Sequence, residues 1–185
     1  MIDIFVRAKY EEPCQLNHFY PVSRILLVLL QQNPLIMRHL EFKQFLPLTA
    51  EEAWKFFSNP ANLSKITPKK MNFIITSRVP EKIYPGLIIT YKVSPLFNIV
   101  LTWVTEITQV HEPFFFIDEQ RSGPYAIWHH EHHFEVVENG IMMTDKLFYK
   151  VPAGAIGNLL DHLFIHKKVN GIFQHRKKFI EANPI

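Results

Sequence analysis

Four histidines within five residues give this sequence its clearest capacity for chemistry. They are His129, His130, His132 and His133, separated only by Glu131. An imidazole can titrate near neutral pH, form hydrogen bonds through both ring nitrogens or bind a metal ion, so the direction of each ring decides its role. In an extended strand, successive side chains point to opposite faces. His130 and His132 therefore share one face, and His129 and His133 share the other.

An Asn139-Gly140 pair between two alternating runs predicts the hairpin that aims these rings. Asn-Gly is typical of a two-residue type I′ turn, in which both central residues have positive φ. This turn pairs His132 with Leu147 and His130 with Tyr149. One face of the hairpin is then mostly apolar, and we expect it to face the interior. Its members are Trp128, His130, His132, Phe134, Val136, Met143, Asp145, Leu147, Tyr149 and Val151.

Four polar side chains on this inner face form the candidate site. They are His130, His132, Asp145 and Tyr149. Buried polar groups must be paired with one another, with water or with a ligand. Asp118 and Gln120 of the preceding strand join the site if the connecting loop spans residues 122–126, because this loop places Asp118 opposite His130.

Besides ligand binding, three interpretations of these polar groups are open. They can form a hydrogen-bonded network in the core without further function. They can catalyse a reaction, with His130 or His132 as general base, Asp145 orienting the imidazole and Tyr149 donating a proton. They can also hold a metal ion, with the two inward histidines and Asp145 as ligands.

Composition narrows the class of protein. A chain of 185 residues with 48% apolar and 20% charged residues suits one domain with a packed core. Its net charge of +3 is too small to require a nucleic acid, and we expect no such partner. No glycine falls into a GxGxxG, GxxxxGK[ST] or GxSxG pattern, which argues against nucleotide enzymes and serine hydrolases. We expect neither a cofactor nor a metal. The single Cys14 fits a reducing, cytoplasmic compartment.

The first 36 residues differ from the rest of the chain. An apolar run at residues 25–30 is far shorter than the roughly 20 residues of a membrane-spanning helix, so we expect no transmembrane segment. Met37 directly precedes the first strand-like segment. We therefore expect residues 1–36 to be a loosely attached extension, upstream of a folded domain at 37–185.

The segment after Met37 predicts strands with two short helices near its start. Alternation around Leu40 predicts the first strand. The capping-box pattern from Thr49 to Glu52 predicts a helix that ends at Asn59-Pro60, and a short helical turn should follow at 62–66. The remaining strands before the hairpin are predicted at about 71–79, 86–93, 98–110 and 113–121.

A long helix should end the chain. Its apolar stripe indicates that it packs on the sheet, and the stripe begins with Ile156, Leu159, Leu160 and Leu163. The helix is also basic, which is typical of a solvated helix surface, and its basic residues are Lys167, Lys168, His175, Arg176, Lys177 and Lys178. These elements predict an α+β fold in which a curved antiparallel sheet of about six to seven strands wraps around the helix.

Several motifs occur in one order along the chain. They are Phe56-Phe57-x-Asn59-Pro60, Phe116-Ile-Asp118-Glu-Gln120, Gly123-Pro124-Tyr125, Trp128-x-His130-x-His132-x-Phe134 and Asp145-x-x-x-Tyr149-x-x-Pro152. Over residues 37–183, this order resembles the ligand-binding SRPBCC proteins, also called START-like or polyketide cyclase/dehydrase-like. The resemblance implies a helix-grip fold with a cavity between sheet and helix for apolar or amphipathic molecules. It identifies no catalytic residue.

We therefore expect a protein that binds a hydrophobic or amphipathic small molecule such as a lipid, polyketide or aromatic compound. The alternative is a cyclase-, dehydrase- or hydrolase-like enzyme that uses the same polar groups. The expected apolar wall consists of Tyr91, Trp103, Phe116, Trp128, Phe134 and Leu147. The expected helical lid consists of Ile156, Leu160 and Leu163. The expected polar end consists of His130, His132, Asp145 and Tyr149, together with Asp118 and Gln120.

Overall fold

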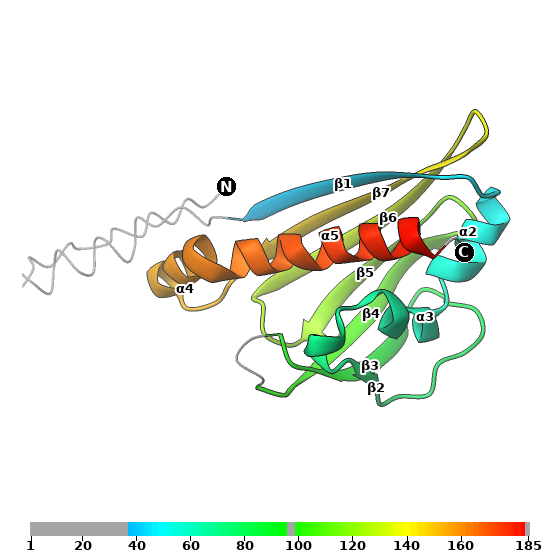
Figure 1. Cartoon of the computed structure of the whole chain (residues 1–185). Helices are drawn as coiled ribbons and strands as arrows, with labels where there is room; N and C mark the ends of the chain where they lie inside the picture. The colour runs from blue at the N-terminus through cyan, green and yellow to red at the C-terminus, as the bar shows by residue number, and fades with distance from the viewer. Residues whose placement is uncertain (1–36, 96–98, 184–185) are drawn as a thin grey trace, which may run out of the picture. The chain divides into compact units, whose positions relative to one another are not determined.

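The computed structural model describes residues 37–95 and 99–183, so the predicted extension at 1–36 lies outside the described residues. Seven strands form one antiparallel sheet, as expected, and their order is β1-β7-β6-β5-β4-β3-β2 (Figure 1). The strands are β1 (Arg38–Leu46), β2 (Ile74–Ile75), β3 (Leu87–Val93), β4 (Leu101–His111), β5 (Phe115–Ser122), β6 (Ile127–Val137) and β7 (Gly140–Lys150).

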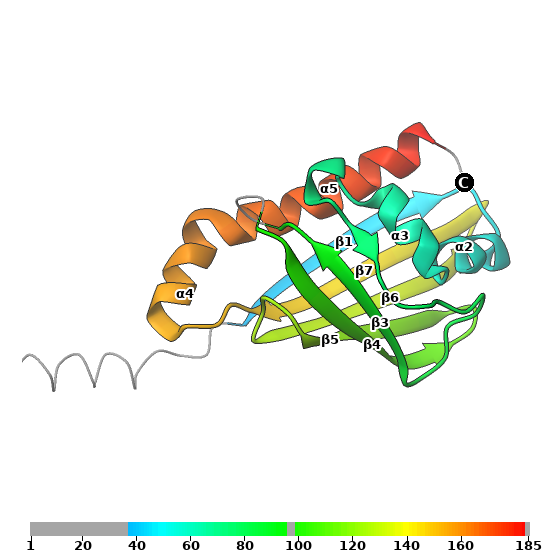
Figure 2. The same cartoon turned by 90° about the horizontal axis from the view of Figure 1, so that it is seen from below.

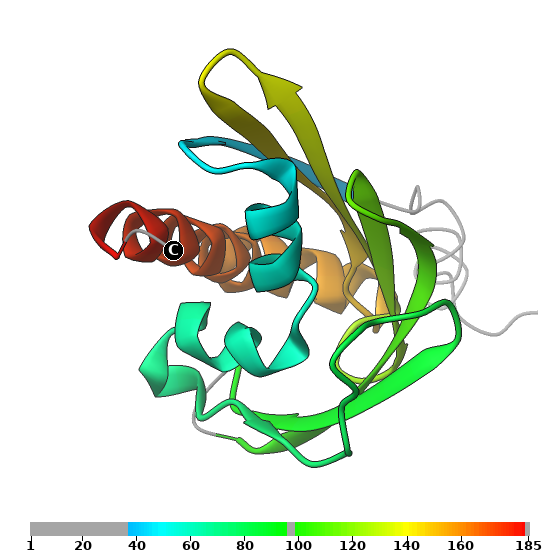
Figure 3. The ribbon, with the colours of Figure 1, turned by 90° about the vertical axis from the view of Figure 1, so that its right-hand side faces the viewer.

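Helices lie on the concave side of this sheet. They are α2 (Ala50–Phe57), α3 (Pro60–Ile66), the 3₁₀ turn η1 (Lys69–Met71), α4 (Gly154–Leu160), the π-helical turn η2 (Asp161–Ile165) and α5 (His166–Ala182). In Figure 3, the sheet curves around α5, and α2 and α3 lie across the end of the space between them. No helix within residues 37–95 and 99–183 is long and apolar enough to cross a membrane.

The capping box predicted for the first helix is present. The Thr49 side chain accepts a hydrogen bond from the Glu52 backbone N–H, and the Glu52 carboxylate accepts one from the Thr49 backbone N–H. Asn59 caps α3 in a similar way, through a hydrogen bond from Ala61 N–H. The two short helices thus begin where polar side chains satisfy free backbone donors.

The strand predicted at 71–79 is much shorter than expected. Only Ile74–Ile75 pairs with β3, because η1 occupies the preceding residues and Asn72 has a left-handed φ of 46°. The other predicted strands are present with shifts of a few residues at their ends.

The β6–β7 hairpin keeps the predicted faces but not the predicted register. Its two-residue loop is Glu138-Asn139, and only Asn139 of the expected turn pair has positive φ. His132 is therefore opposite Asp145 rather than Leu147. Because the shift is two positions, each side chain keeps its predicted direction. The residues of the predicted inner face are buried, except for half-buried Trp128 and for Val136, which is 65% exposed near the hairpin tip.

Gly140 has a packing role at this hairpin. A Cβ on Gly140 would collide with the Leu46 backbone oxygen at the end of β1. Glycine is needed here for the close approach of a neighbouring strand, instead of for the positive φ that the sequence predicted.

The predicted apolar lid lies on the wrong face of the C-terminal helix. Ile156, Leu160 and Leu163 are 44–68% exposed on α4 and η2, which extend past the ends of the strands (Figure 2). Asp161 takes the buried position instead, because Arg38 pairs with its carboxylate at 2.6 Å and Tyr149 donates a hydrogen bond to it at 2.8 Å. Farther along, the buried face of α5 consists of Val169, Phe173, Arg176 and Ile180.

Candidate functional site

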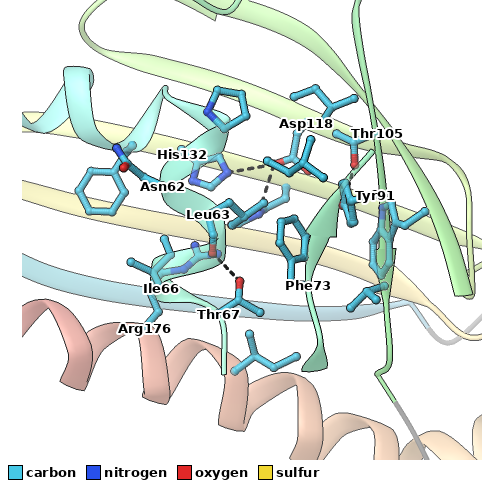
Figure 4. Close-up of a pocket in the computed structure, with 18 of the residues that line it drawn as sticks. Asn62, Leu63, Ile66, Thr67, Phe73, Tyr91, Thr105, Asp118, His132 and Arg176 are labelled. Carbon is cyan, nitrogen blue, oxygen red and sulfur yellow. Dashed lines mark hydrogen bonds and ion pairs between the residues drawn. The ribbon is translucent and has the colours of Figure 1, made fainter. Parts of the chain in front are cut away.

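A cavity of about 160 Å³ lies between the concave face of the sheet, α3 and α5 (Figure 4). Most of its wall is apolar. The aromatic side chains are Phe56, Phe57, Phe73, Tyr91, Trp103, Phe116, Tyr125, Trp128 and Phe173. The polar side chains are Ser58, Asn59, Asn62, Thr67, Thr105, Asp118, His130, His132 and Arg176.

Nearly half of the residues proposed from the sequence line this cavity. They are Tyr91, Trp103, Phe116, Asp118, Trp128, His130 and His132. Asp118 pairs with His130 across β5 and β6, as predicted for a connecting loop that spans residues 122–126. These side chains come from four neighbouring strands, and the alternation of each strand is enough to direct them inward.

The other proposed residues lie elsewhere. Phe134 is buried against Trp54 and Phe57, behind the cavity wall. Leu147 is fully buried in a second core cluster with Val169 and Phe173. The three lid residues are exposed, as described above.

Gln120 closes a loop and does not line the cavity. Its amide nitrogen donates a hydrogen bond to the Tyr125 backbone oxygen at 2.6 Å, and its amide oxygen accepts one from the Tyr125 N–H at 3.2 Å. Gln120 thereby fixes the β5–β6 connection, which carries Tyr125 into the cavity wall.

Tyr149 is separate from the inward histidines. Its hydroxyl donates to Asp161 and lies 3.2 Å from His166 Nδ1, beneath the C-terminal helix. Burial and the neighbouring Asp161 carboxylate raise the pKa of Tyr149 above its ordinary value. Tyr149 is on the inner face as predicted, but its predicted grouping with the two histidines was wrong, because its partners come from a helix whose docking the hairpin pattern does not specify.

Asp118, His130, His132 and Asp145 form a closed cluster, named here the Asp–His cluster. His130 Nε2 lies 2.9 Å from Asp145 Oδ1, and His132 Nε2 lies 2.9 Å from Asp118 Oδ2. The second nitrogens are close to the opposite carboxylates: His130 Nδ1 is 3.4 Å from Asp118 Oδ2, and His132 Nδ1 is 3.0 Å from Asp145 Oδ1. His132 Nδ1 and Asp145 Oδ1 are close but are not aligned for a hydrogen bond, so His132 Nδ1 has no hydrogen-bond partner among the described residues.

The cluster is strongly ionic despite its burial. Burial by itself raises the pKa of Asp118, but hydrogen bonds from His130 and His132 outweigh burial and hold this pKa well below its usual range. Burial also raises the pKa of Asp145, but the Arg176 charge and the His130 hydrogen bond outweigh burial and hold this pKa well below its usual value. Burial lowers the pKa of His130, and the two carboxylates more than reverse this effect, so the pKa is raised.

Arg176 is one of the residues of this site that sequence reasoning missed. Its Nη1 lies 3.4 Å from Asp145 Oδ1, and its guanidinium lies over the Phe173 ring at 5.0 Å. The sequence prediction placed it with the solvated basic face of the helix. The signal was its spacing, because Arg176 is three residues after Phe173 and four before Ile180, on the apolar stripe.

A polar band crosses the cavity wall from β3 to α5. The Tyr91 hydroxyl and Thr105 Oγ1 are 2.9 Å apart on β3 and β4, and the Asp–His cluster and Arg176 continue the band. Trp103, on β4 beside them, has a buried Nε1–H without a hydrogen-bond partner among the described residues. The wall therefore combines a hydroxyl pair with a charged cluster.

The outer face of β6 carries the other two histidines, as predicted. His129 Nδ1 is 2.8 Å from a Glu119 carboxylate oxygen, and His133 Nε2 is 2.7 Å from one of Glu131. These side chains are only partly buried and lie on the opposite side of the strand from the cavity.

No protein-family model matches this chain, and no curated protein matches its sequence. Solved structures do match its fold. Ginseng major latex-like protein 151 from Panax ginseng is 13% identical, with a TM-score of 0.60 over 81% of this chain and 99% of that protein. TTHA0849 from Thermus thermophilus is 13% identical, with a TM-score of 0.59 over 80% of this chain and 100% of that one.

A third similar structure is Ms6760 from Mycobacterium smegmatis. It is 14% identical, with a TM-score of 0.56, and the match covers 78% of this chain and 91% of Ms6760. Identities this low establish shared architecture alone. The sheet, the two short helices and the long C-terminal helix give this chain the Bet v1-like helix-grip fold.

Proposed function

We propose that the cavity binds a small hydrophobic molecule that carries at least one polar group. The observation that carries this proposal is a largely aromatic cavity with a polar band on one wall. Ligand sites typically combine an apolar lining with a few polar groups that fix orientation. A cavity formed only by imperfect packing would not need a charged cluster in its wall.

The cavity size limits the ligand. At about 160 Å³, the space resembles an apolar cavity of about 150 Å³ that accepts benzene. One aromatic ring or a short chain fits this space, whereas a lipid or a polyketide requires the walls to move apart. A substituted monocyclic aromatic compound is therefore the best starting probe.

The polar band indicates which ligand group would bind. Tyr91, Thr105 and Arg176 line the cavity and carry hydrogen-bond donors, so they favour an acceptor oxygen such as a carbonyl, phenol or carboxylate.

The order of motifs supports membership of the SRPBCC proteins, and the helix-grip fold agrees with this resemblance. The resemblance implies a carrier or receptor for apolar molecules more directly than any specific reaction. Cys14 fits a protein that acts in the cytoplasm. Fold alone does not determine activity, so the proposal depends on the cavity.

Isothermal titration of the whole chain with p-cresol, and with toluene as its non-polar counterpart, tests the proposal. Saturable binding is expected for both, with p-cresol tighter. Ile75→Trp should weaken p-cresol binding at least about tenfold, because Ile75 lines the cavity and the larger side chain fills it. The matched control is Ile74→Trp, at the preceding residue of β2, which is 59% exposed.

Two results would contradict cavity binding. The first is the absence of saturable binding by either compound to the folded protein. The second is an equal effect of Ile74→Trp and Ile75→Trp. Circular dichroism of each variant separates loss of binding from loss of folding.

A second candidate function is acid–base catalysis. It is favoured by two imidazoles that line the cavity while Asp145 contacts both of them from behind. Tyr149 has no part in this version, because its hydroxyl is bonded to Asp161. Hydrolysis of p-nitrophenyl acetate would fall in His132→Gln and persist in His129→Gln, and equal rates in both variants would exclude this candidate.

A further inference from the structure

Three metal-binding side chains converge in the wall of the cavity. Asp118 on β5 and His130 and His132 on β6 each offer one ligand atom, and these three atoms lie within 4.8 Å of one another. All three residues line the cavity. Two imidazoles and one carboxylate are the donor set of several zinc and non-haem iron sites, which leave a coordination position open.

Asp145 lies where a supporting carboxylate would be needed. Its Oδ1 is 2.9 Å from His130 Nε2 and 3.0 Å from His132 Nδ1, on the far side of both imidazoles from Asp118. In metal sites, a ligating imidazole usually donates its second N–H to a carboxylate or carbonyl, which fixes the tautomer and the ring orientation. One carboxylate serves both imidazoles here, and Arg176 lies 3.4 Å from it.

The unpartnered nitrogen of His132 is explained by this arrangement. In the structure, His132 Nε2 bonds to Asp118 and leaves Nδ1 without a hydrogen bond, although Asp145 is only 3.0 Å away. A metal ion on Nε2 would move the ring proton to Nδ1. The N–H there would then point toward a carboxylate, and a small ring rotation would make the missing hydrogen bond.

When both imidazoles are neutral and donate to Asp145, this tautomer favours a cation between the three ligands. When both imidazoles donate to Asp145, the lone pairs of His130 Nδ1 and His132 Nε2 face Asp118 Oδ2, at 3.4 and 2.9 Å. Three electron-pair donors in a buried pocket repel one another unless a positive charge lies between them.

We infer that Asp118, His130 and His132 form a binding site for a divalent transition-metal ion such as Zn²⁺, with Asp145 as the positioning residue. This inference corrects the expectation of no metal. It also replaces Asp145, the third ligand considered from the sequence, with Asp118. An open coordination position would border the cavity, and only this last point rests on the proposed function.

Zinc titration of the whole chain, purified without a histidine tag and stripped with a chelator, tests the inference. One Zn²⁺ per chain is expected in competition with a chromophoric chelator. Asp118→Asn and His132→Gln should each weaken Zn²⁺ binding at least about tenfold, and Asp145→Asn about 10- to 100-fold. The control is His129→Gln combined with His133→Gln on the outer face of β6, which should leave this affinity unchanged.

A readout on the unaltered chain covers the case in which a variant does not fold. Replacing Zn²⁺ with Co²⁺ should give the visible absorption of a low-coordinate site with nitrogen and oxygen ligands. Zinc should also shift the ring-nitrogen NMR signals of two histidines, His130 and His132. The outer-face control variant identifies these signals, because it lacks the imidazoles of His129 and His133.

The inference is overturned if zinc binding is lost in the outer-face variant and kept in Asp118→Asn and His132→Gln. It is also overturned if the unaltered chain binds zinc no more tightly than Asp118→Asn does. Titration with p-cresol separates the two proposals. Cresol binding without zinc binding rejects the metal site alone, and zinc binding without cresol binding rejects the proposed ligand.

Discussion

At the scale of single residues, the molecule has an ionic cluster at the edge of an aromatic cavity. Burying two carboxylates is costly unless each has cationic and hydrogen-bonding partners. His130 and His132 on β6 are the hydrogen-bonding partners of the two carboxylates, and Arg176 on α5 adds a positive charge beside Asp145. The charge of the cluster thus ties the helix to the sheet at the site.

Arg176→Met tests this connection. Removing the guanidinium leaves Asp145 with fewer counter-charges while keeping most of the apolar stem. We expect the free energy of unfolding to fall by about 3 kcal/mol, the lower end for breaking a buried pair, since the contact is long. Lys177→Met, at the exposed next residue, should change it by less than about 0.5 kcal/mol. Equal urea midpoints for both variants would contradict this account.

The orientation of the two inward histidines could be predicted from the sequence, but their partners could not. Their direction depends only on strand parity, which survived a register shift of two positions. The contact of His132 with Asp118 depends on the length of the β5–β6 loop, which the sequence left open. The partners of Tyr149 and Arg176 depend on how a helix docks, and no local pattern contains that information.

At the scale of elements, two glycines show how backbone contacts shape the fold. Gly140→Ala should lower the free energy of unfolding by about 1–3 kcal/mol, because its new Cβ would collide with the Leu46 backbone oxygen. Gly171→Ala should raise it by about 0.5–1 kcal/mol, because Gly171 is exposed in α5 and has open space around it. Thermal melts measure both, and the same sign for the two substitutions would refute the argument.

The short helices and most strands were predictable because caps, proline and alternation are local signals. The buried face of the C-terminal helix could not be predicted from such local signals. Its first apolar residues suggested a buried stripe, yet the ion pair between Arg38 and Asp161 links β1 to η2 and turns a polar residue inward. A tertiary contact between distant segments decided the face.

At the scale of the whole molecule, the described core lies entirely between Leu46 and Ile180. The seven strands and all described helices fall within residues 38–182. We therefore expect residues 37–185 to fold alone, with a melting temperature close to that of the whole chain. An unfolded circular dichroism spectrum for this fragment would show that the first 36 residues are needed.

The overall architecture was the most predictable level, because strand punctuation and a long final helix leave few arrangements. The cavity could be placed between sheet and helix, but its size could not be predicted. Its volume depends on how completely the side chains of α3, β2 and α5 fill the space.

The most direct test of the central claim is a crystal structure of the whole chain with p-cresol. We expect density for the ring between α5 and the sheet, with its oxygen within hydrogen-bond distance of the Tyr91 hydroxyl, Arg176 or the Asp–His cluster. Density for p-cresol only on the protein surface, with the cavity unoccupied at saturating concentration, would contradict it.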